Sequence, residues 1–505
     1  MNRSLGYVVL FLAAGCAPAP PPSAGSASTP APPGTERRLG ADVRFLASDL
    51  LEGRGTPSRG LDVAAEYLAE GLRGAGVAPG AGSSYQQWYS VAEYRPADAR
   101  VAIAIDGKPL KAEDYLFINL ARDPAAGPID LELVYTGTGV VAEEKRTDEL
   151  SGLDLKKKAA VALKGAPWTP DPAETFGPER AIGKVMAVTV RGAEMLVYLS
   201  QELDTGTEAE AAFFREMKSA PVAFVRETGI GSLSALNPIL VLRPGAFEAA
   251  TGSRLDGLQK GPLGKRIRIT IEAPVSAGKA SNVLGKIPGA DPALAGEWIV
   301  LSAHYDHLGS HAAKPGEDGI WNGADDDASG TAGVLEIARR FAASPGKRSI
   351  LVFFTSGEDR GIFGSAFYAA HPAVAMSQVI AQVNLDMIGR STGRVEGIAP
   401  AAPGLFTETV ELGKTHGIEV IPDQHPAWRT IYLTDVYHFA RFGVPGVEFF
   451  TGLHADYHQP GDTADKIRYP SMTRIVEVAS ALARRYADGK TRPAFNRPAW
   501  FLTPP

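Results

Sequence analysis

The segment GADDDASG, from Gly323 to Gly330, holds consecutive carboxylates in a loop of small residues that leads into an apolar stretch. Carboxylates that lie close together repel one another, so folding them into one loop is unfavourable unless a cation or a dipole compensates. A divalent metal ion and the N-terminus of the following helix would both compensate. Upstream, the segment from Ala303 to His307 reads AHYDH, and histidine with carboxylate is the ligand set of hydrolytic zinc sites.

The histidines are unevenly distributed along the chain. There are nine in 505 residues, and none precedes His304. One short window contains His304, His307 and His311, and a second contains His454 and His458. Because scattered structural histidines would not cluster in this way, the distribution favours metal binding, above all for His304 and His458.

The second half of the chain has the pattern of an α/β fold. Continuous apolar runs at 298–301, 349–354, 379–385 and 447–450 are typical of strands buried on both faces, and 331–341 has helical spacing. We therefore expect a mostly parallel twisted sheet flanked by helices. Candidate ligands lie at or just beyond the end of each run, where open α/β sheets place their sites: His304, Glu358, Asp359, Asp386, His454 and His458.

These candidates suit two metal ions better than one. A single catalytic zinc takes three protein ligands and keeps one position open, whereas this chain offers more candidates than that. A carboxylate in a tight loop can bridge two ions about 3.5–4 Å apart. In the pair Glu358-Asp359, one carboxylate can bind metal while its neighbour accepts a proton from water.

Taken in order, these motifs resemble those of the bacterial double-zinc aminopeptidases, whose relatives include glutamate carboxypeptidase and the transferrin receptor. The residues that carry the resemblance are His304, GADDDASG, SGED at 356–359, NLDM at 384–387 and YHQPGDT at 457–463. The resemblance covers about 282–467.

The resemblance implies two Zn²⁺ ions and a ligand for each position. His304 and Asp386 would bind one zinc, Asp359 and His458 would bind the other, and Asp326 would bridge them. The family usually carries glutamate where this chain has Asp359, which is one methylene shorter. The second zinc is therefore expected to sit displaced or to bind more weakly.

Other residues acquire roles from the same resemblance. Glu358 would be the general base, and Tyr457 would donate a hydrogen bond to the oxyanion. Asp306 would orient His304 from behind. For Asp325 and Asp327 we expect helix capping or support of the ligands, not direct ligation.

The expected function is that of an exported zinc aminopeptidase, which removes N-terminal amino acids from peptides. A carboxypeptidase, a dipeptidase or a glutaminyl cyclase on the same scaffold remains an alternative. An alternative of another class is a binding lipoprotein whose site is inactive. The net charge of −6 and the absence of a basic stripe argue against a nucleic-acid partner.

The chain divides by composition. Residues 36–128 read as the N-terminal part of the peptidase domain, 278–490 as its catalytic part and 491–505 as a tail. Between them, 129–277 is rich in short β-type runs and contains no histidine. This insert resembles a protease-associated domain, which implies a role in substrate access and no chemistry.

The N-terminus has the features of an export signal. Residues 1–16 combine a positive charge, a short apolar run and small residues before Cys16, the chain's one cysteine. This resembles a bacterial lipoprotein signal with Cys16 lipid-modified, and simple secretion is the alternative. Residues 17–35 are rich in Pro, Ala and Ser and predict a tether. We thus expect a protein exported to the cell envelope that meets the membrane only through its lipid.

Overall fold

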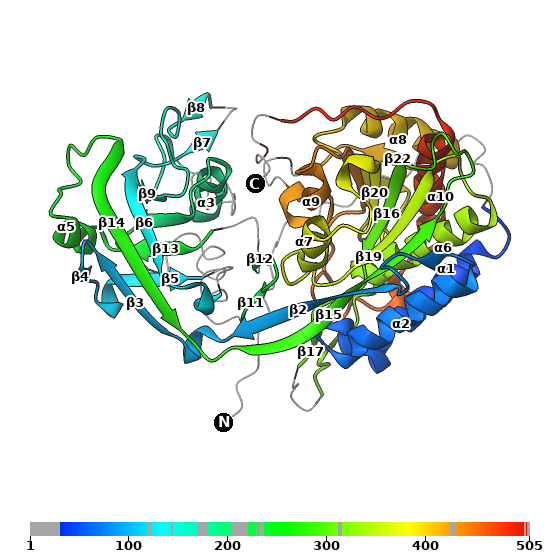
Figure 1. The fold of residues 1–505 in the computed structure, drawn as a ribbon, viewed down its shortest axis with the longest axis horizontal. Helices are drawn as coiled ribbons and strands as arrows, with labels where there is room; N and C mark the ends of the chain where they lie inside the picture. Colours follow the sequence, from blue (N-terminus) through cyan, green and yellow to red (C-terminus); the bar gives the residue numbers. More distant parts are fainter. Residues whose placement is uncertain are drawn as a thin grey trace.

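The protein forms two lobes, each built around its own β-sheet (Figure 1). A computed structural model describes residues 31–119, 123–142, 145–169, 180–203, 221–228, 230–231, 237–311, 316–424, 426, 430–498 and 501. The two long strands β14 (Gly261–Glu272) and β15 (Ser276–Ile287) follow one another, one in each sheet, and so link the lobes.

The larger sheet has the order β12-β11-β2-β15-β19-β16-β20-β23-β21-β22, with β1 paired to β15. Its four central strands β19, β16, β20 and β23 are parallel. Antiparallel strands flank this centre on both sides, at β15 and at β21. Besides β15, its strands are β1 (Ala78–Pro79), β2 (Gln86–Tyr94), β11 (Val222–Val225), β12 (Ile230–Gly231), β16 (Trp298–His304), β19 (Ser349–Thr355), β20 (Val379–Leu385), β21 (Arg394–Ile398), β22 (Glu419–Ile421) and β23 (Gly446–Phe450).

The α/β class expected from the sequence is confirmed, with one refinement. The sheet is mixed, and the continuous run of parallel strands is confined to the four central strands that the apolar runs predicted. These strands are apolar throughout because both faces are covered: Ile299 and Leu301 of β16 face one core, and Val300 between them faces another. The flanking strands carry polar residues as well, and their direction is set by partners distant in the chain.

Helices cover both faces of this sheet. On one face lie α1 (Thr35–Leu46), α2 (Arg59–Gly74), α6 (Gly330–Ala343), α8 (Pro403–His416) and α10 (Tyr469–Asp488), which share the main core. On the other lie α7 (Phe363–Ala370) and α9 (Val436–Ala440), whose residues Tyr368 and Phe439 pack on Phe353. The helix expected at 331–341 is α6.

The smaller sheet has the order β4-β3-β14-β6-β9-β10-β13-β5. The helices α3 (Ala181–Val190) and α5 (Pro244–Thr251) cover opposite faces, because Val185 and Phe247 belong to different cores. The remaining strands of this sheet are β3 (Arg100–Ile105), β4 (Lys108–Pro109), β5 (Tyr115–Ile118), β6 (Ile129–Tyr135), β9 (Ala159–Leu163), β10 (Met195–Leu199) and β13 (Ile239–Leu242).

The smaller sheet does not follow the predicted insert boundaries of 129 and 277. It begins at Arg100, because β14 pairs with β3 on one side and with β6 on the other. In addition, β11 and β12 lie inside the predicted insert but extend the larger sheet through β2. Such pairings join strands far apart in the chain and leave no local signal. The likeness of this lobe to a protease-associated domain remains a prediction.

Several predictions concern residues that the structure does not describe. The predicted signal at 1–16, its Cys16 and the tether as far as residue 30 lie outside the described residues, and the end of the predicted tether, Thr35, already begins α1. Within the described part of the chain, no helix has both the length and the apolar character needed to cross a bilayer.

Candidate metal centre

The candidate ligands meet at one edge of the larger sheet. His304 is the last residue of β16, and Asp386 directly follows Leu385, the last residue of β20. Glu358 and Asp359 follow β19, and His458 follows β23. Since these four strands are parallel and adjacent, their carboxyl ends lie together, and the loops beyond them share one space.

The loop of consecutive aspartates turns their side chains in different directions. Asp325 Oδ1 accepts a hydrogen bond from the main-chain nitrogen of Gly389 at 2.6 Å. Asp327 Oδ1 accepts from the nitrogens of Gly330 at 2.9 Å and Met387 at 3.0 Å. These two carboxylates thus hold the start of α6 against the loop after β20, which is the supporting place expected for them. Of the three aspartates, Asp326 is the one that faces His304 and His458.

Asp326 presents its two oxygens to two different groups of side chains. Its Oδ1 lies 3.1 Å from His304 Nε2, which is itself 3.6 Å from Asp386 Oδ1. Its Oδ2 lies 3.1 Å from His458 Nε2, which is 3.1 Å from Asp359 Oδ1. The structure therefore brings the five predicted ligands together, with Asp326 between two histidine–carboxylate pairs.

The donor set fits metal ions. The carboxylates of Asp326, Asp359 and Asp386 converge with little solvent exposure, and their mutual repulsion requires a positive partner. His458 Nε2 is buried and makes no hydrogen bond within the described residues, although it faces two carboxylates. Imidazole nitrogen with carboxylate oxygen is the set that zinc binds in hydrolytic sites.

The charges of this centre shift the pKa values of its members. Burial raises the pKa of Asp326, but His307, His304 and His458 outweigh that effect and hold it well below its usual range. Burial lowers the pKa of His458, and the carboxylates of Asp359 and Asp326 reverse this and raise it to about 10. His458 therefore holds a proton at neutral pH unless a metal ion displaces it.

The residues predicted to act on substrate lie beside this cluster. Burial raises the pKa of Glu358 well above its usual value; nearby His304 opposes this, and Asp359 and Asp386 add to it. The ring of Tyr457 stacks on that of His458, with centroids 3.8 Å apart. Burial, reinforced by the nearby carboxylates, raises the pKa of the Tyr457 phenol well above its usual value.

Asp306 connects two of these elements. Its Oδ1 lies 3.7 Å from His304 Nδ1 and accepts a hydrogen bond from the main-chain nitrogen of Glu358 at 3.2 Å. Its Oδ2 accepts from the Thr56 hydroxyl at 3.0 Å. One buried carboxylate thus holds the loop after β19 close to His304.

A family comparison addresses the same part of the chain. Residues 282–483 match the model of peptidase family M28. This segment belongs to peptidase family M28. The M28 segment contains His304, Asp326, Asp359, Asp386 and His458, and also Glu358 and Tyr457.

Curated relatives match parts of the chain. The uncharacterized protein YfbL of Escherichia coli K12 is 27% identical over 238 residues, which are 41% of this chain and 71% of that protein. A probable zinc metalloprotease of Pyrenophora tritici-repentis is 37% identical over 114 residues, 22% of this chain and 23% of its own length. The chain therefore spans about a quarter of that fungal relative.

Solved structures resemble the chain over most of its length. The aminopeptidase from Aneurinibacillus sp. strain AM-1 is 18% identical with a TM-score of 0.48, covering 92% of this chain and 96% of its own. BSAP, a zinc aminopeptidase from Bacillus subtilis, is 14% identical with a TM-score of 0.45, covering 92% and 98%.

Sequence reasoning missed a residue outside the M28 segment. Arg54 is fully buried, and its guanidinium donates to main-chain oxygens of Tyr305 at 2.8 Å, Asn322 at 2.7 Å and Gly323 at 3.0 Å, and also to that of Leu46. It therefore ties the loop after His304 to the loop before Asp326. Nothing in the spacing of the segment that ends at Arg54 indicated these contacts.

His307 was also missed as a member of the site, although it was counted among the clustered histidines. Its Nδ1 lies 2.8 Å from Asp359 Oδ2, and with Asp326 and Asp359 it forms a group able to hold a metal ion. The nearby His454 has a different neighbour, since its Nε2 lies 3.2 Å from Asp325 Oδ2. Neither contact follows from sequence spacing alone.

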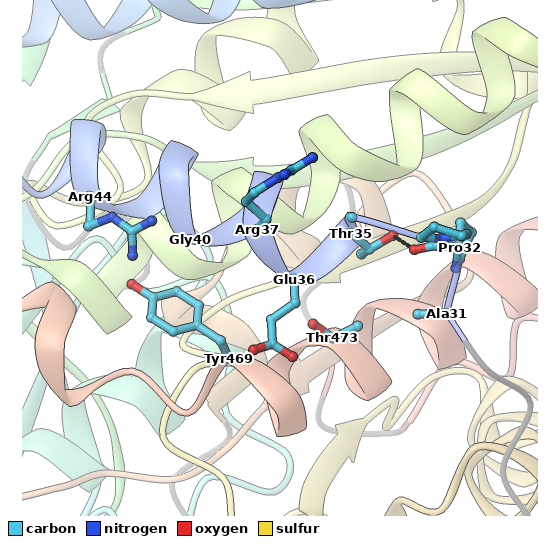
Figure 2. Close-up of a pocket in the computed structure, with 11 residues that line it drawn as sticks. Ala31, Pro32, Thr35, Glu36, Arg37, Gly40, Arg44, Tyr469 and Thr473 are labelled. Atoms are coloured by element: carbon cyan, nitrogen blue, oxygen red, sulfur yellow. Dashed lines mark hydrogen bonds between the residues drawn. The ribbon is translucent and has the colours of Figure 1, made fainter.

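A pocket of about 580 Å³ lies elsewhere, between α1 and α10 (Figure 2). Glu36, Arg44, Tyr469 and Thr473 are among its lining residues. None of the candidate ligands lines it, so we assign it no part in the chemistry of the metal centre.

Proposed function

We propose that this protein is a zinc-dependent exopeptidase, and specifically an aminopeptidase that binds two zinc ions. The observation that carries the proposal is Asp326, whose two oxygens lie 3.1 Å from His304 Nε2 and 3.1 Å from His458 Nε2. A carboxylate placed in this way suits a bridge between two ions. Family membership of the M28 segment and the name of the fungal relative support zinc as the metal.

The chemistry divides between the ions and the chain. When bound, zinc supplies a Lewis acid that polarises the peptide carbonyl and lowers the pKa of water. Glu358 takes a proton from the attacking water and returns it to the leaving amine. Its raised pKa suits this task, because a carboxylate of ordinary pKa would hold the proton too weakly.

Tyr457 donates a hydrogen bond to the carbonyl oxygen as negative charge develops there. The raised pKa of its phenol keeps the hydroxyl protonated at neutral pH and thus able to donate. Stacking on His458 fixes the plane of the ring beside the ligand cluster. Asp306 contacts both His304 and the main chain of Glu358 and so positions the base beside the ligand.

Metal stoichiometry combined with a substrate panel tests the proposal. Purified protein should contain two zinc ions per chain and release fluorophore from aminoacyl amides, while N-blocked peptides remain intact. Cleavage of N-blocked peptides from the carboxyl end would instead support the carboxypeptidase alternative, and cyclisation of N-terminal glutamine would support the cyclase. Protein free of zinc and inactive on every substrate would favour a binding protein and contradict the enzyme assignment.

We further propose that the protein is exported and anchored through a lipid on Cys16. The resemblance of residues 1–16 to a bacterial lipoprotein signal that ends at Cys16 supports this. Expression of Cys16→Ser should move the protein from the membrane fraction to the soluble fraction. If both forms fractionate as soluble protein, simple secretion is the better assignment.

For the smaller lobe we propose a role in substrate access. The expected likeness to a protease-associated domain supports this, together with the covalent continuity of β14 and β15, which joins this lobe to the catalytic sheet. Substitutions in the smaller lobe should then change KM for long peptides more than KM for aminoacyl amides. Equal effects on both substrates would contradict the role.

A further inference from the structure

His307 lies beside Asp359 and Asp326, two of the three residues expected to bind the second zinc ion, but the proposed mechanism gives it no role. Its Nδ1 is 2.8 Å from Asp359 Oδ2 and 3.8 Å from Asp326 Oδ2. The same two carboxylates lie 3.1 Å from His458 Nε2. The rings of His307 and His458 meet edge to face with centroids 5.6 Å apart, so two imidazoles approach one pair of carboxylates.

The His307 ring is held firmly in this place. The residue is fully buried, and its main-chain nitrogen donates to the Arg54 oxygen at 3.2 Å. A Cβ at Gly323, whose φ is +56°, would lie 2.6 Å from Cγ and Cδ2 of this ring. The absence of a side chain at Gly323 thus makes the room that the imidazole occupies.

We propose that His307 is a protein ligand of the second metal position, together with Asp326, Asp359 and His458. This inference rests on the proposed zinc function and names a fourth side chain beyond the three that the family resemblance assigns there. Nδ1 is the nitrogen concerned, because it faces both carboxylates. The other nitrogen, Nε2, is buried and has no hydrogen-bond partner in the described part of the chain.

The separations between donor atoms fit a shared ion. Tetrahedral zinc with bonds of 2.0–2.1 Å places its ligand atoms about 3.3 Å from one another. From Asp326 Oδ2, His307 Nδ1 lies at 3.8 Å and His458 Nε2 at 3.1 Å, whereas Asp359 meets His307 with Oδ2 at 2.8 Å and His458 with Oδ1 at 3.1 Å. These four separations lie on both sides of that value, and His307, Asp326 and Asp359 form a group whose ligand atoms are close enough to share an ion. A hydrogen bond from His307 Nδ1 to Asp359 would explain the distance of 2.8 Å between them. It would not explain why Nδ1 also lies near Asp326.

The proposal also accounts for the aspartate at 359. This side chain is one methylene shorter than the glutamate that the resemblance leads one to expect. Its carboxylate therefore extends less far toward the ion. A neutral imidazole restores a strong donor without adding negative charge. The second position then has four protein ligands and the first has three, from His304, Asp326 and Asp386. Four protein ligands are typical of tightly held zinc, and three leave a place open for water or substrate.

The direct test is a crystal structure of the zinc-loaded protein with anomalous diffraction at the zinc edge. We expect an ion within about 2.1 Å of His307 Nδ1, the usual length of a zinc–nitrogen bond. An ion held by Asp359 and His458 but lying about 3 Å or more from Nδ1 would overturn the proposal while leaving the zinc enzyme intact. If zinc binds at neither position, the proposed function fails as well.

Metal affinity of variants gives an independent test in solution. His307→Asn keeps an amide N–H near the place of Nδ1 but removes the imidazole, and His307→Ala removes both. Loss of a supporting hydrogen bond weakens metal binding by about 10–100-fold, whereas loss of a ligand should weaken the second zinc by more than about 100-fold in both variants. The matched control, His371→Ala, changes an exposed histidine outside the cluster and should retain two zinc ions.

Retention of the second zinc by His307→Asn, with loss in His307→Ala, would show that hydrogen bonding to Asp359 suffices and would overturn ligation. Circular dichroism of each variant establishes that it folds. Should a variant fail to fold, the diffraction measurement on the unaltered protein still decides the question.

Discussion

Arg54 donates a hydrogen bond from Nε to the main-chain oxygen of Tyr305 at 2.8 Å, across 251 positions of the chain. The same guanidinium reaches Asn322 and Gly323, so a residue outside the M28 segment joins the loop after His304 to the loop before Asp326. A planar fork of five N–H donors suits this task, and lysine cannot reproduce it.

Arg54→Lys should therefore destabilise the protein. Several buried carbonyl oxygens would lose their partner, and each unsatisfied group costs about 1–3 kcal/mol, so we expect the free energy of unfolding to fall by about 3 kcal/mol or more. Urea unfolding of the metal-loaded protein measures this. Arg59→Lys, at an exposed position on α2, is the control and should change little. Equal stability of both variants would contradict the bracing role.

Glu358→Gln should retain zinc and lose turnover. Glutamine has nearly the same shape but cannot accept the proton of the attacking water, and general-base catalysis contributes about 10²–10⁴-fold. We expect kcat to fall by that factor or more with two zinc ions still bound, as measured by metal analysis and aminoacyl amide hydrolysis. Near-normal hydrolysis would refute the base assignment. Glu419→Gln, on an exposed strand residue, serves as the matched control.

Gly323→Ala should disrupt the metal centre although it replaces none of the ligands. The added Cβ would lie 2.1 Å from the main-chain oxygen of Asp326 and 2.6 Å from the ring of His307. In addition, the φ of residue 323 is positive, which alanine disfavours. We expect a loss of stability of about 1–3 kcal/mol together with reduced zinc content. Gly393→Ala, also at a positive φ but with open space around the Cβ, separates backbone strain from the collision.

Zinc binding should release protons and strengthen as pH rises. In metal-free protein the pKa of His458 is raised to about 10 by Asp359 and Asp326, against the opposing effect of burial. Zinc must displace that proton, so affinity should increase from neutral pH up to about pH 10. Calorimetry in buffers of different ionisation enthalpy counts the protons released. Binding without proton release at pH 7 would contradict this charge state.

The same shift predicts how the metal-free protein responds to pH. The folded-state pKa of His458 lies above the unfolded value of about 6.5. Protonation of His458 therefore contributes its full share to the stability of the metal-free protein below about pH 6.5. The contribution is then lost as pH rises through about 10. Thermal unfolding of metal-free protein should therefore show a fall in Tm over this alkaline range, and His458→Gln should flatten it.

Part of this protein could be predicted from local patterns. The apolar runs ending near His304, Thr355, Leu385 and Phe450 are the four parallel central strands, because a strand buried on both faces must be apolar throughout. Parallel neighbours bring their carboxyl ends to one edge. That rule placed His304, Glu358, Asp359, Asp386, His454 and His458 at one edge, and the family resemblance selected the ligands among them. The structure brings His304, Asp359, Asp386 and His458 together with Asp326.

Other features depended on contacts between segments far apart in the chain. The pairing of β14 with both β3 and β6, which starts the smaller sheet at Arg100, has no local pattern. Arg54 and His307 likewise acquire their places only when the segments around Gly55, Gly323 and Asp359 pack against one another. Amino-acid types determined the chemistry available and the strands that present it. Tertiary packing decided which buried side chains face the same carboxylates, because burial and distance belong to the folded chain and not to sequence spacing.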